Sequence, residues 1–243
     1  MTGASLWLNA HSLVSLLTNN SRVTSWKDDS DGSNAILIQN ESLKQPLFIS
    51  DGLGNENEPG IRFDGETTFL ESTIPYVGSE STMFAVFKDE GTTCDCCSGV
   101  LFFTNSFNGI STLPAKGAVD DDDNNHGQDS PIVTTLDFPG SAAYGHTNIR
   151  NKVVVASSVY TSTGPSSSFV DNCLQYSSPV SGTSGSGGVQ VGTRNNELQR
   201  FFKGVIGEIV VFNRLLTEIE TSEMYTYFAS VWPSMPKKQC VKE

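Results

Sequence analysis

Short apolar runs, each about the length of one strand, recur along most of the 243-residue chain. Runs of about four to eight residues rich in Val, Ile, Phe and Thr, with Gly, Pro and Asn between them, are typical of β-strands. No crossover helices separate these runs, so the sheets are expected to be antiparallel and stacked as a sandwich. The predicted strands cover residues 6–8, 22–26, 35–38, 46–49, 60–63, 82–87, 99–103, 131–138, 153–160, 188–192 and 201–212.

The run at 201–212 is expected to be a central strand. Strict alternation predicts two apolar faces, with Ile206, Val210 and Phe212 on one and Val205, Ile209 and Val211 on the other. A strand that is apolar on both faces needs cover on both sides. The turn Asn213-Arg214 then leads out of the strand.

Two segments carry helical periodicity instead. The spacing of Leu13, Leu16 and Leu17 predicts one or two helical turns within residues 11–18. Thr217-Glu218-Ile219-Glu220 is a capping box, whose Thr hydroxyl and last Glu carboxylate satisfy free backbone N–H groups at a helix start. We therefore expect a closing helix of about four turns on the outside of the sandwich. Its inward face is predicted to contain Thr221, Met224, Tyr225, Phe228, Val231 and Trp232, and Pro233 ends it.

Several motifs follow one another in a recognisable order. They are Leu6-Trp7-Leu8-Asn9-Ala10, Val23-Thr24-Ser25-Trp26-Lys27-Asp28, Asp31-Gly32, Gly60-Ile61-Arg62-Phe63-Asp64-Gly65, Phe69-Leu70, Met83-Phe84-Ala85-Val86-Phe87-Lys88, Val189-Gln190-Val191-Gly192 and the segment 202–214. This order resembles that of laminin-G-like and concanavalin A-like jelly-roll domains of the lectin–glucanase superfamily, over about 6–89 and 186–232. The resemblance implies a jelly-roll sandwich and identifies no ligand. We expect one domain at 1–236 and a tail at 237–243.

The charge of the chain limits its partners. It has 15 Lys and Arg against 27 Asp and Glu, a net charge of −12. Nucleic acid and anionic lipid need basic clusters, so neither is expected as a partner. Cations, basic proteins and neutral glycans fit such a surface better.

No apolar stretch approaches the roughly 20 residues that span a bilayer, so membrane insertion is not expected. Residues 1–9 do not resemble a signal peptide, which fits an intracellular protein or a sequence that starts after processing or at the edge of a longer chain. The five cysteines do not settle the compartment, because their number is odd, and the glycosylation sequons at Asn19-Asn20-Ser21 and Asn40-Glu41-Ser42 are close to chance in so Asn- and Ser-rich a chain. We expect a secreted or extracellular protein.

Five cysteines form the most unusual local feature, and three of them are clustered. They are Cys94, Cys96, Cys97, Cys173 and Cys240. Disulfides fit a secreted protein and leave one thiol over, because the number is odd. Free thiols and a zinc site of three thiolates with one further ligand are the alternatives. In a secreted chain we expect Cys173 to pair with one member of the cluster, which closes a loop worth about 4 kcal/mol.

A run of four aspartates lies in a stretch with almost no apolar residue. Asp120, Asp121, Asp122 and Asp123 offer carboxylate oxygens, the ligands that Ca²⁺ prefers. The segment 120–129 lacks the Gly and the closing Glu of an EF-hand, and a solvated acidic loop is the alternative. We expect no cofactor, with Ca²⁺ as the open alternative, and we treat these aspartates as candidate partner-binding residues.

Catalytic patterns are missing from the predicted strands. Glycosidases need two carboxylates from one face of a strand, at alternate positions. Glu56 and Glu58 fall in a loop, Glu218 and Glu220 in the capping box, and Glu208 has no acidic neighbour in its strand. The chain also lacks a Gly-x-Ser-x-Gly elbow. We therefore predict a protein that is not an enzyme.

Three tryptophans raise the question of sugar stacking. Trp7, Trp26 and Trp232 all lie in apolar or amphipathic patterns, so we expect them in the core.

These observations favour a binding and assembly module of an extracellular, surface or matrix structure, in contact with a protein partner or with further copies of itself. Its contacts are expected on loops of residues 90–186, which the resemblance does not cover and where Phe102, Phe103 and Phe107 lie near loops. A basic partner surface or bridging cations, including those of a mineral, would match the charge. A carbohydrate-binding lectin, with or without calcium, and a glycoside hydrolase are the alternatives.

Overall fold

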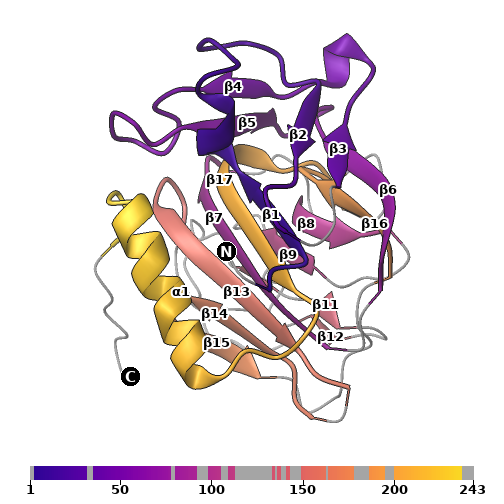
Figure 1. Ribbon diagram of the computed structural model, residues 1–243, viewed down its shortest axis with the longest axis vertical. Helices are drawn as coiled ribbons and strands as arrows, with labels where there is room; N and C mark the ends of the chain where they lie inside the picture. Colours follow the sequence, from indigo (N-terminus) through magenta and orange to yellow (C-terminus); the bar gives the residue numbers. More distant parts are fainter. Residues whose placement is uncertain are drawn as a thin grey trace, which may run out of the picture.

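The computed structural model describes residues 3–31, 35–77, 80–91, 98–104, 109–112, 133–134, 136–137, 141–142, 149–162, 164–177, 186–194 and 200–236. Across these residues the chain forms two large antiparallel sheets that enclose a core, with one α-helix on the outer face of the first sheet (Figure 1). The predicted fold class, an antiparallel two-sheet sandwich with a C-terminal helix, is confirmed.

The first sheet has the strand order β15-β14-β13-β7-β17-β5-β4, and β1 pairs with β17 beside it. Its strands are β1 (Leu6–Asn9), β4 (Leu47–Ile49), β5 (Gly60–Asp64), β7 (Ser81–Asp89), β13 (Val153–Tyr160), β14 (Ser167–Val170), β15 (Cys173–Ser177) and β17 (Lys203–Phe212). β1 lies antiparallel to β17, from Leu6 opposite Val211 to Asn9 opposite Glu208, so a strand near the start of the chain pairs with the strand that precedes the helix.

The second sheet has the order β10-β9-β8-β16-β6-β3-β2, and β11 pairs with β12 in a small third sheet. The strands of these two sheets are β2 (Ser25–Lys27), β3 (Ile36–Ile38), β6 (Leu70–Val77), β8 (Ser98–Phe103), β9 (Gly109–Thr112), β10 (Val133–Thr134), β11 (Leu136–Asp137), β12 (Ser141–Ala142) and β16 (Ser186–Val191). Two 3-10 helices, η1 (Ala10–Leu13) and η2 (Ser42–Lys44), lie in the N-terminal part of the chain.

The central strand β17 departs from strict alternation at one point. Its register against β7 shifts between Ile206 and Glu208, which makes Gly207 a β-bulge. One extra residue changes the face that the following side chains occupy. Ile206, Ile209 and Val211 thus face the second sheet, and Val205, Val210 and Phe212 face the helix. The predicted faces were therefore wrong for Val205 and Ile206.

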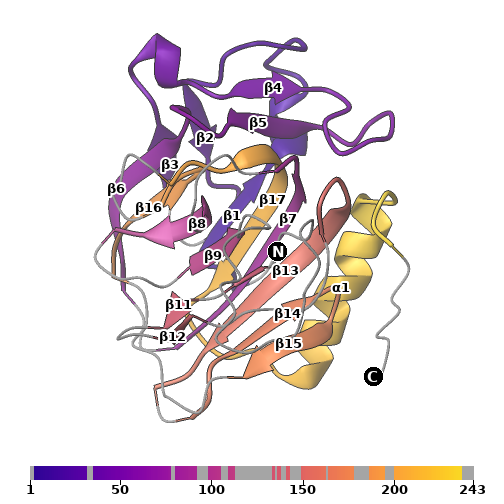
Figure 2. The same ribbon diagram turned by 180° about the vertical axis from the view of Figure 1, so that it is seen from behind.

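The helix α1 (Glu218–Val231) begins at the predicted capping box. The Thr217 hydroxyl accepts from the Glu220 backbone N–H at 3.2 Å, and the Glu220 carboxylate accepts from the Thr217 N–H at 2.8 Å. Met224, Phe228 and the C-cap Trp232 are buried against the sheet. Figure 2 shows the helix from behind, beside β13, β14 and β15. The predicted helix and its inward face are confirmed.

Trp232 can lie against β17 because residue 207 is a glycine. A Cβ atom at Gly207 would lie 2.8 Å from the Trp232 ring and 2.5 Å from Leu53. The loop that carries Leu53 is also tied to the helix end, since the buried Glu58 carboxylate accepts from the Ser234 backbone N–H at 2.6 Å. This loop, in which Leu53 and Glu58 are buried, thus contributes to the core.

Several strands escaped prediction. β6, β9, β14 and β15 are rich in polar or small residues, and β6 includes Pro75, so their composition resembles that of loops. The predicted strand at 131–138 is divided into β10 and β11. Of the one or two helical turns predicted within 11–18, one forms, as the 3-10 helix η1. Leu13 is buried, whereas Leu16 is 73% exposed, so a longer buried helical face is absent there.

Two aromatic residues assigned to a contact surface lie inside the protein. Phe102 and Phe103 of β8 are both fully buried. The expectation that they lie near loops and contact a partner is therefore wrong. Phe107 lies outside the described residues.

Replacing Trp232 with Ala should lower the free energy of unfolding by about 3–5 kcal/mol, as other large aromatic truncations in cores do. The reason is that Trp232 is fully buried between the helix end and β17. Urea denaturation followed by circular dichroism measures the change. Ile219→Ala is the matched control, because Ile219 lies on the same helix and is 73% exposed. Equal midpoints for Trp232→Ala and the wild type would contradict this packing.

Candidate functional site

A single carboxylate lies between the first sheet and the helix. Glu208 of β17 is completely buried, and four side chains donate hydrogen bonds to it. Oε1 accepts from Trp7 Nε1 at 2.6 Å, from the Tyr227 hydroxyl at 2.8 Å and from Asn9 Nδ2 at 3.3 Å. Oε2 accepts from Trp232 Nε1 at 2.6 Å. These donors come from β1, from α1 and from the C-cap of α1, so Glu208 joins both chain ends to the central strand.

Burial and hydrogen bonding act on Glu208 in opposite directions. Removal from water raises the pKa of its carboxyl, and the indole N–H groups of Trp232 and Trp7 lower it, with burial the larger effect. Burial and the nearby Glu208 carboxylate also raise the pKa of the Tyr227 phenol. The phenol therefore keeps its proton at neutral pH and remains a donor.

Glu208 is a structural group and not a catalytic acid. Both of its oxygens already accept hydrogen bonds, and none of its surface is exposed to a substrate. Glu208, which has no acidic neighbour in its strand, thus connects β1, β17 and α1.

Two of the donors to Glu208 also line a surface groove of about 390 Å³ beside the helix. Trp7 and Tyr227 are half-buried, and their polar atoms point inward to Glu208. Their rings therefore contribute apolar surface to the groove. Phe212 and Met224, together with the half-buried Leu216, complete its apolar lining. We call this feature the α1 groove.

The expectation that all three tryptophans belong to the core holds for two of them. Trp26 and Trp232 are fully buried, whereas Trp7 is half-buried and lines the α1 groove. Trp7 is on the sheet face that the helix covers, but it lies at the side of the helix and is therefore only partly covered. The periodicity of the sequence does not indicate this position.

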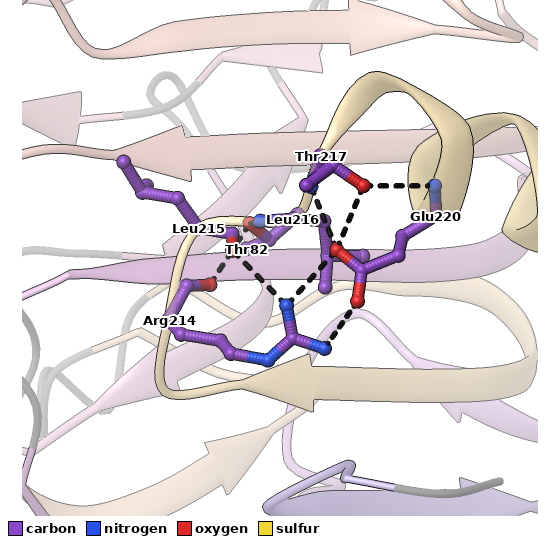
Figure 3. A network of polar contacts seen from close by, with 6 residues as sticks. All are labelled: Thr82, Arg214, Leu215, Leu216, Thr217 and Glu220. Carbon is purple, nitrogen blue, oxygen red and sulfur yellow. Dashed lines mark hydrogen bonds and ion pairs between the residues drawn. The ribbon is translucent and has the colours of Figure 1, made fainter.

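Two charged residues that line the α1 groove, Arg214 and Glu220, form an ion pair. Figure 3 shows this pair at the start of α1. Glu220 accepts from Arg214 through both of its oxygens, with Nη2 to Oε1 at 2.7 Å and Nη1 to Oε2 at 3.0 Å. The Arg214 hydrogen bonds and those of Thr217 lower the pKa of the Glu220 carboxyl to about 2. The Arg214 guanidinium also lies over the Phe212 ring, 5.7 Å from its centroid.

The turn between β17 and α1 is held against β7. The Thr82 hydroxyl donates to the Arg214 carbonyl at 3.1 Å and accepts from the Leu216 N–H at 3.2 Å (Figure 3). This fixes the charged pair relative to the sheet. Glu223, which also lines the α1 groove, is exposed, and its carboxylate pairs with no other described residue.

The candidate residues from the sequence are not brought into this groove. Asp120, Asp121, Asp122 and Asp123 lie outside the described residues, as do Cys94, Cys96, Cys97 and Cys240. Cys173 is described at the start of β15, and its pairing remains a prediction. Within the described ranges, no three His, Cys, Asp or Glu side chains are grouped so that they could hold a metal ion. No described helix is long and apolar enough to cross a membrane.

Replacing Glu208 with Gln should lower the free energy of unfolding by about 1–3 kcal/mol, the cost of a buried polar group left without a partner. Glutamine removes the buried charge, but its amide NH₂ must then face an indole N–H or another donor. Urea denaturation at neutral pH measures the change, with the exposed Glu66→Gln as the control. A Glu208→Gln variant at least as stable as the wild type would show that the cost of the buried charge outweighs its hydrogen bonds.

Comparisons with known proteins support the fold and no particular family. The sequence matches no protein-family model and no curated protein. Among solved structures, the binding domain of botulinum neurotoxin serotype G is similar, with a TM-score of 0.58, 13% identity and coverage of 93% of this chain and 51% of that chain. The binding domain of Paraclostridial Mosquitocidal Protein 1 has a TM-score of 0.57 and 11% identity, with 93% and 52% coverage.

Trypanosoma rangeli sialidase is also similar, with a TM-score of 0.59, 14% identity and coverage of 98% of this chain and 34% of that chain. The chain thus spans about half of the toxin chains and about a third of the sialidase. At these identities the likeness extends to the β-sandwich fold alone. The chain has a jelly-roll-like β-sandwich fold, and the narrower laminin-G-like or concanavalin A-like assignment remains a prediction.

Proposed function

We propose that this chain is a non-catalytic binding and assembly module that receives a protein partner in the α1 groove. The observation that carries the proposal is the pair of half-buried rings, Trp7 and Tyr227, held in place from beneath by Glu208. Aromatic residues are enriched at protein interfaces because they bury a large area with little loss of side-chain freedom. Rings fixed by a buried carboxylate lose still less freedom on binding.

The similar structures support a binding role without defining it. One of them is described as the receptor-binding domain of botulinum neurotoxin type G, at 15% identity. Trypanosoma rangeli sialidase, in contrast, is an enzyme, and this chain covers 34% of it. Glu208 is inaccessible to substrates, which favours binding over catalysis.

The wider setting is part of the same proposal. We propose that residues 1–236 act as one secreted or extracellular module of a surface or matrix structure. Its net charge of −12 favours a basic partner or bridging cations, including those of a mineral. Loops of residues 90–186 are proposed to contribute a second contact surface, with Asp120, Asp121, Asp122 and Asp123 as its candidate residues.

A glycan is the second candidate ligand, and the half-buried Trp7 beside the Glu223 carboxylate favours it. A sugar also needs several free hydrogen-bonding groups to fix its orientation. The polar atoms of Trp7 and Tyr227 are already bonded to Glu208, and those of Glu220 to Arg214 and Thr217. A protein partner is therefore the better match, and we expect glycan arrays and polysaccharide hydrolysis assays to be negative.

Carboxylate footprinting should locate the contact surface. The isolated chain and the native assembly would each be labelled with carbodiimide and glycine ethyl ester and then mapped by mass spectrometry. We expect Glu223 to lose most of its labelling in the assembly, because a partner in the α1 groove covers it. Glu66 lies at the opposite end of β17 and should label equally in both samples. Equal labelling of Glu223 in the two samples would refute binding at this groove.

Replacing Asp120, Asp121, Asp122 and Asp123 together with Ser tests the second surface. Aspartates in a polar segment are not expected in the core, so the melting temperature should stay within about 2 °C of the wild type, as for other surface changes. Assembly measured by analytical ultracentrifugation with the native partner should weaken and depend less on salt. An unchanged sedimentation profile would remove the aspartate run from the proposal.

A further inference from the structure

We infer that the α1 groove takes the side chain of a lysine or arginine from a basic segment of a partner protein. This inference rests on the proposed function and names its ligand. A cation carried on an apolar stem fits a groove that combines aromatic rings with the exposed carboxylate of Glu223, which pairs with no residue that the structure describes. Three properties of the groove favour this ligand, namely its engaged polar atoms, its charge and its shape.

The polar atoms that line the groove are mostly engaged. Trp7 Nε1 and the Tyr227 hydroxyl donate to Glu208, and their rings remain as apolar surface. Glu220 accepts two hydrogen bonds from Arg214 and further ones from Thr217. A ligand in the groove would thus contact ring surface and few free hydrogen-bond donors. An anion and a sugar both need such donors, so both are disfavoured.

The charge of the groove is negative. The Arg214–Glu220 pair is neutral as a unit, so Glu223 decides the sign. Two more carboxylates strengthen the negative potential from nearby. The Glu208 carboxylate lies beneath the two rings, and the Asp28 carboxylate accepts from the Trp7 backbone N–H at 2.8 Å.

Glu218, in the first turn of α1, adds to the same field. A negative potential over aromatic faces attracts a cation and repels a carboxylate.

The shape of the groove suits a side chain better than a whole domain surface. Its volume is about 390 Å³, and Leu216 and Met224 extend the apolar lining beyond the rings. The methylenes of a lysine or arginine can lie along this lining while the charged end reaches Glu223. Burying the stem and pairing the charge therefore occur in one contact.

The test uses the full chain labelled with 5-fluorotryptophan and observed by ¹⁹F NMR. Trp7 is the half-buried tryptophan, whereas Trp26 and Trp232 are fully buried, so the Trp7 resonance reports on the groove. Hexalysine is titrated in low salt, and cellohexaose is titrated in parallel. We expect hexalysine to move the Trp7 resonance saturably and to leave the other two in place. Cellohexaose should move none of them.

Two variants with the same change in charge separate the groove from general attraction. Glu223→Gln should weaken hexalysine binding by about fivefold, the size expected for one exposed ion pair. Glu66→Gln should leave binding within experimental error, because Glu66 lies at the other end of β17. Equal weakening in both variants, or no movement of Trp7, would overturn the inference. A response to cellohexaose alone would do so in favour of a glycan.

Failure of the inference and failure of the proposed function give different results. If footprinting shows that Glu223 is covered in the native assembly but hexalysine does not move the Trp7 resonance, the cationic ligand is wrong and the proposed binding module is still supported. If Glu223 is labelled equally in the assembly and hexalysine does not move the Trp7 resonance, both the cationic ligand and binding at the α1 groove are wrong.

Discussion

A carboxylate removed from water must be surrounded by hydrogen-bond donors, because an ionised group buried without them is far costlier than one hydrogen bond is favourable. Glu208, in β17, meets this requirement only when β1 and α1 are both in place. Its donors Trp7 and Asn9 belong to β1, Tyr227 belongs to α1, and Trp232 caps that helix. The closing of the helix over the sheet and the pairing of β1 with β17 therefore support each other.

The sequence predicts the parts of this arrangement that depend on local pattern. The capping box at Thr217 places the start of α1, and the apolar run up to Phe212 identifies the central strand. What it does not predict depends on position in three dimensions. The bulge at Gly207 changes which face of β17 the side chains on either side of it occupy, and the periodicity of the sequence does not indicate it. β14 and β15 are polar enough to resemble loops, since β15 lies at the edge of the sheet.

The candidate site shows the same division. The apolar neighbours of Trp7 in the sequence predict a core residue. Trp7 is half-buried because it lies beside the helix and not beneath it. Glu208 did carry a signal, namely a lone acidic residue in an otherwise apolar strand. The carboxylate of such a residue is either hydrogen-bonded to donors or exposed to water. A central strand covered on both faces has no exposed position, so its carboxylate must accept hydrogen bonds. Glu208 is thus predictable as a buried hydrogen-bond centre, whereas its donors Tyr227 and Trp232 depend on the packing of the helix and are not predictable from the sequence.

Stability and selectivity in the α1 groove follow from the same bonds. By engaging the indole N–H and the phenol, Glu208 fixes two rings and also removes the donors that a sugar or an anion would use. The net charge of −12 draws basic partners from a distance, but this attraction acts on any cation and is screened over about 10 Å at 0.1 M salt. Contact between a cation and ring surface beside Glu223 acts at short range and is screened less. In the proposed function, the net charge therefore supplies a general attraction for basic partners, and the rings held by Glu208 supply the short-range contacts that distinguish one partner from another.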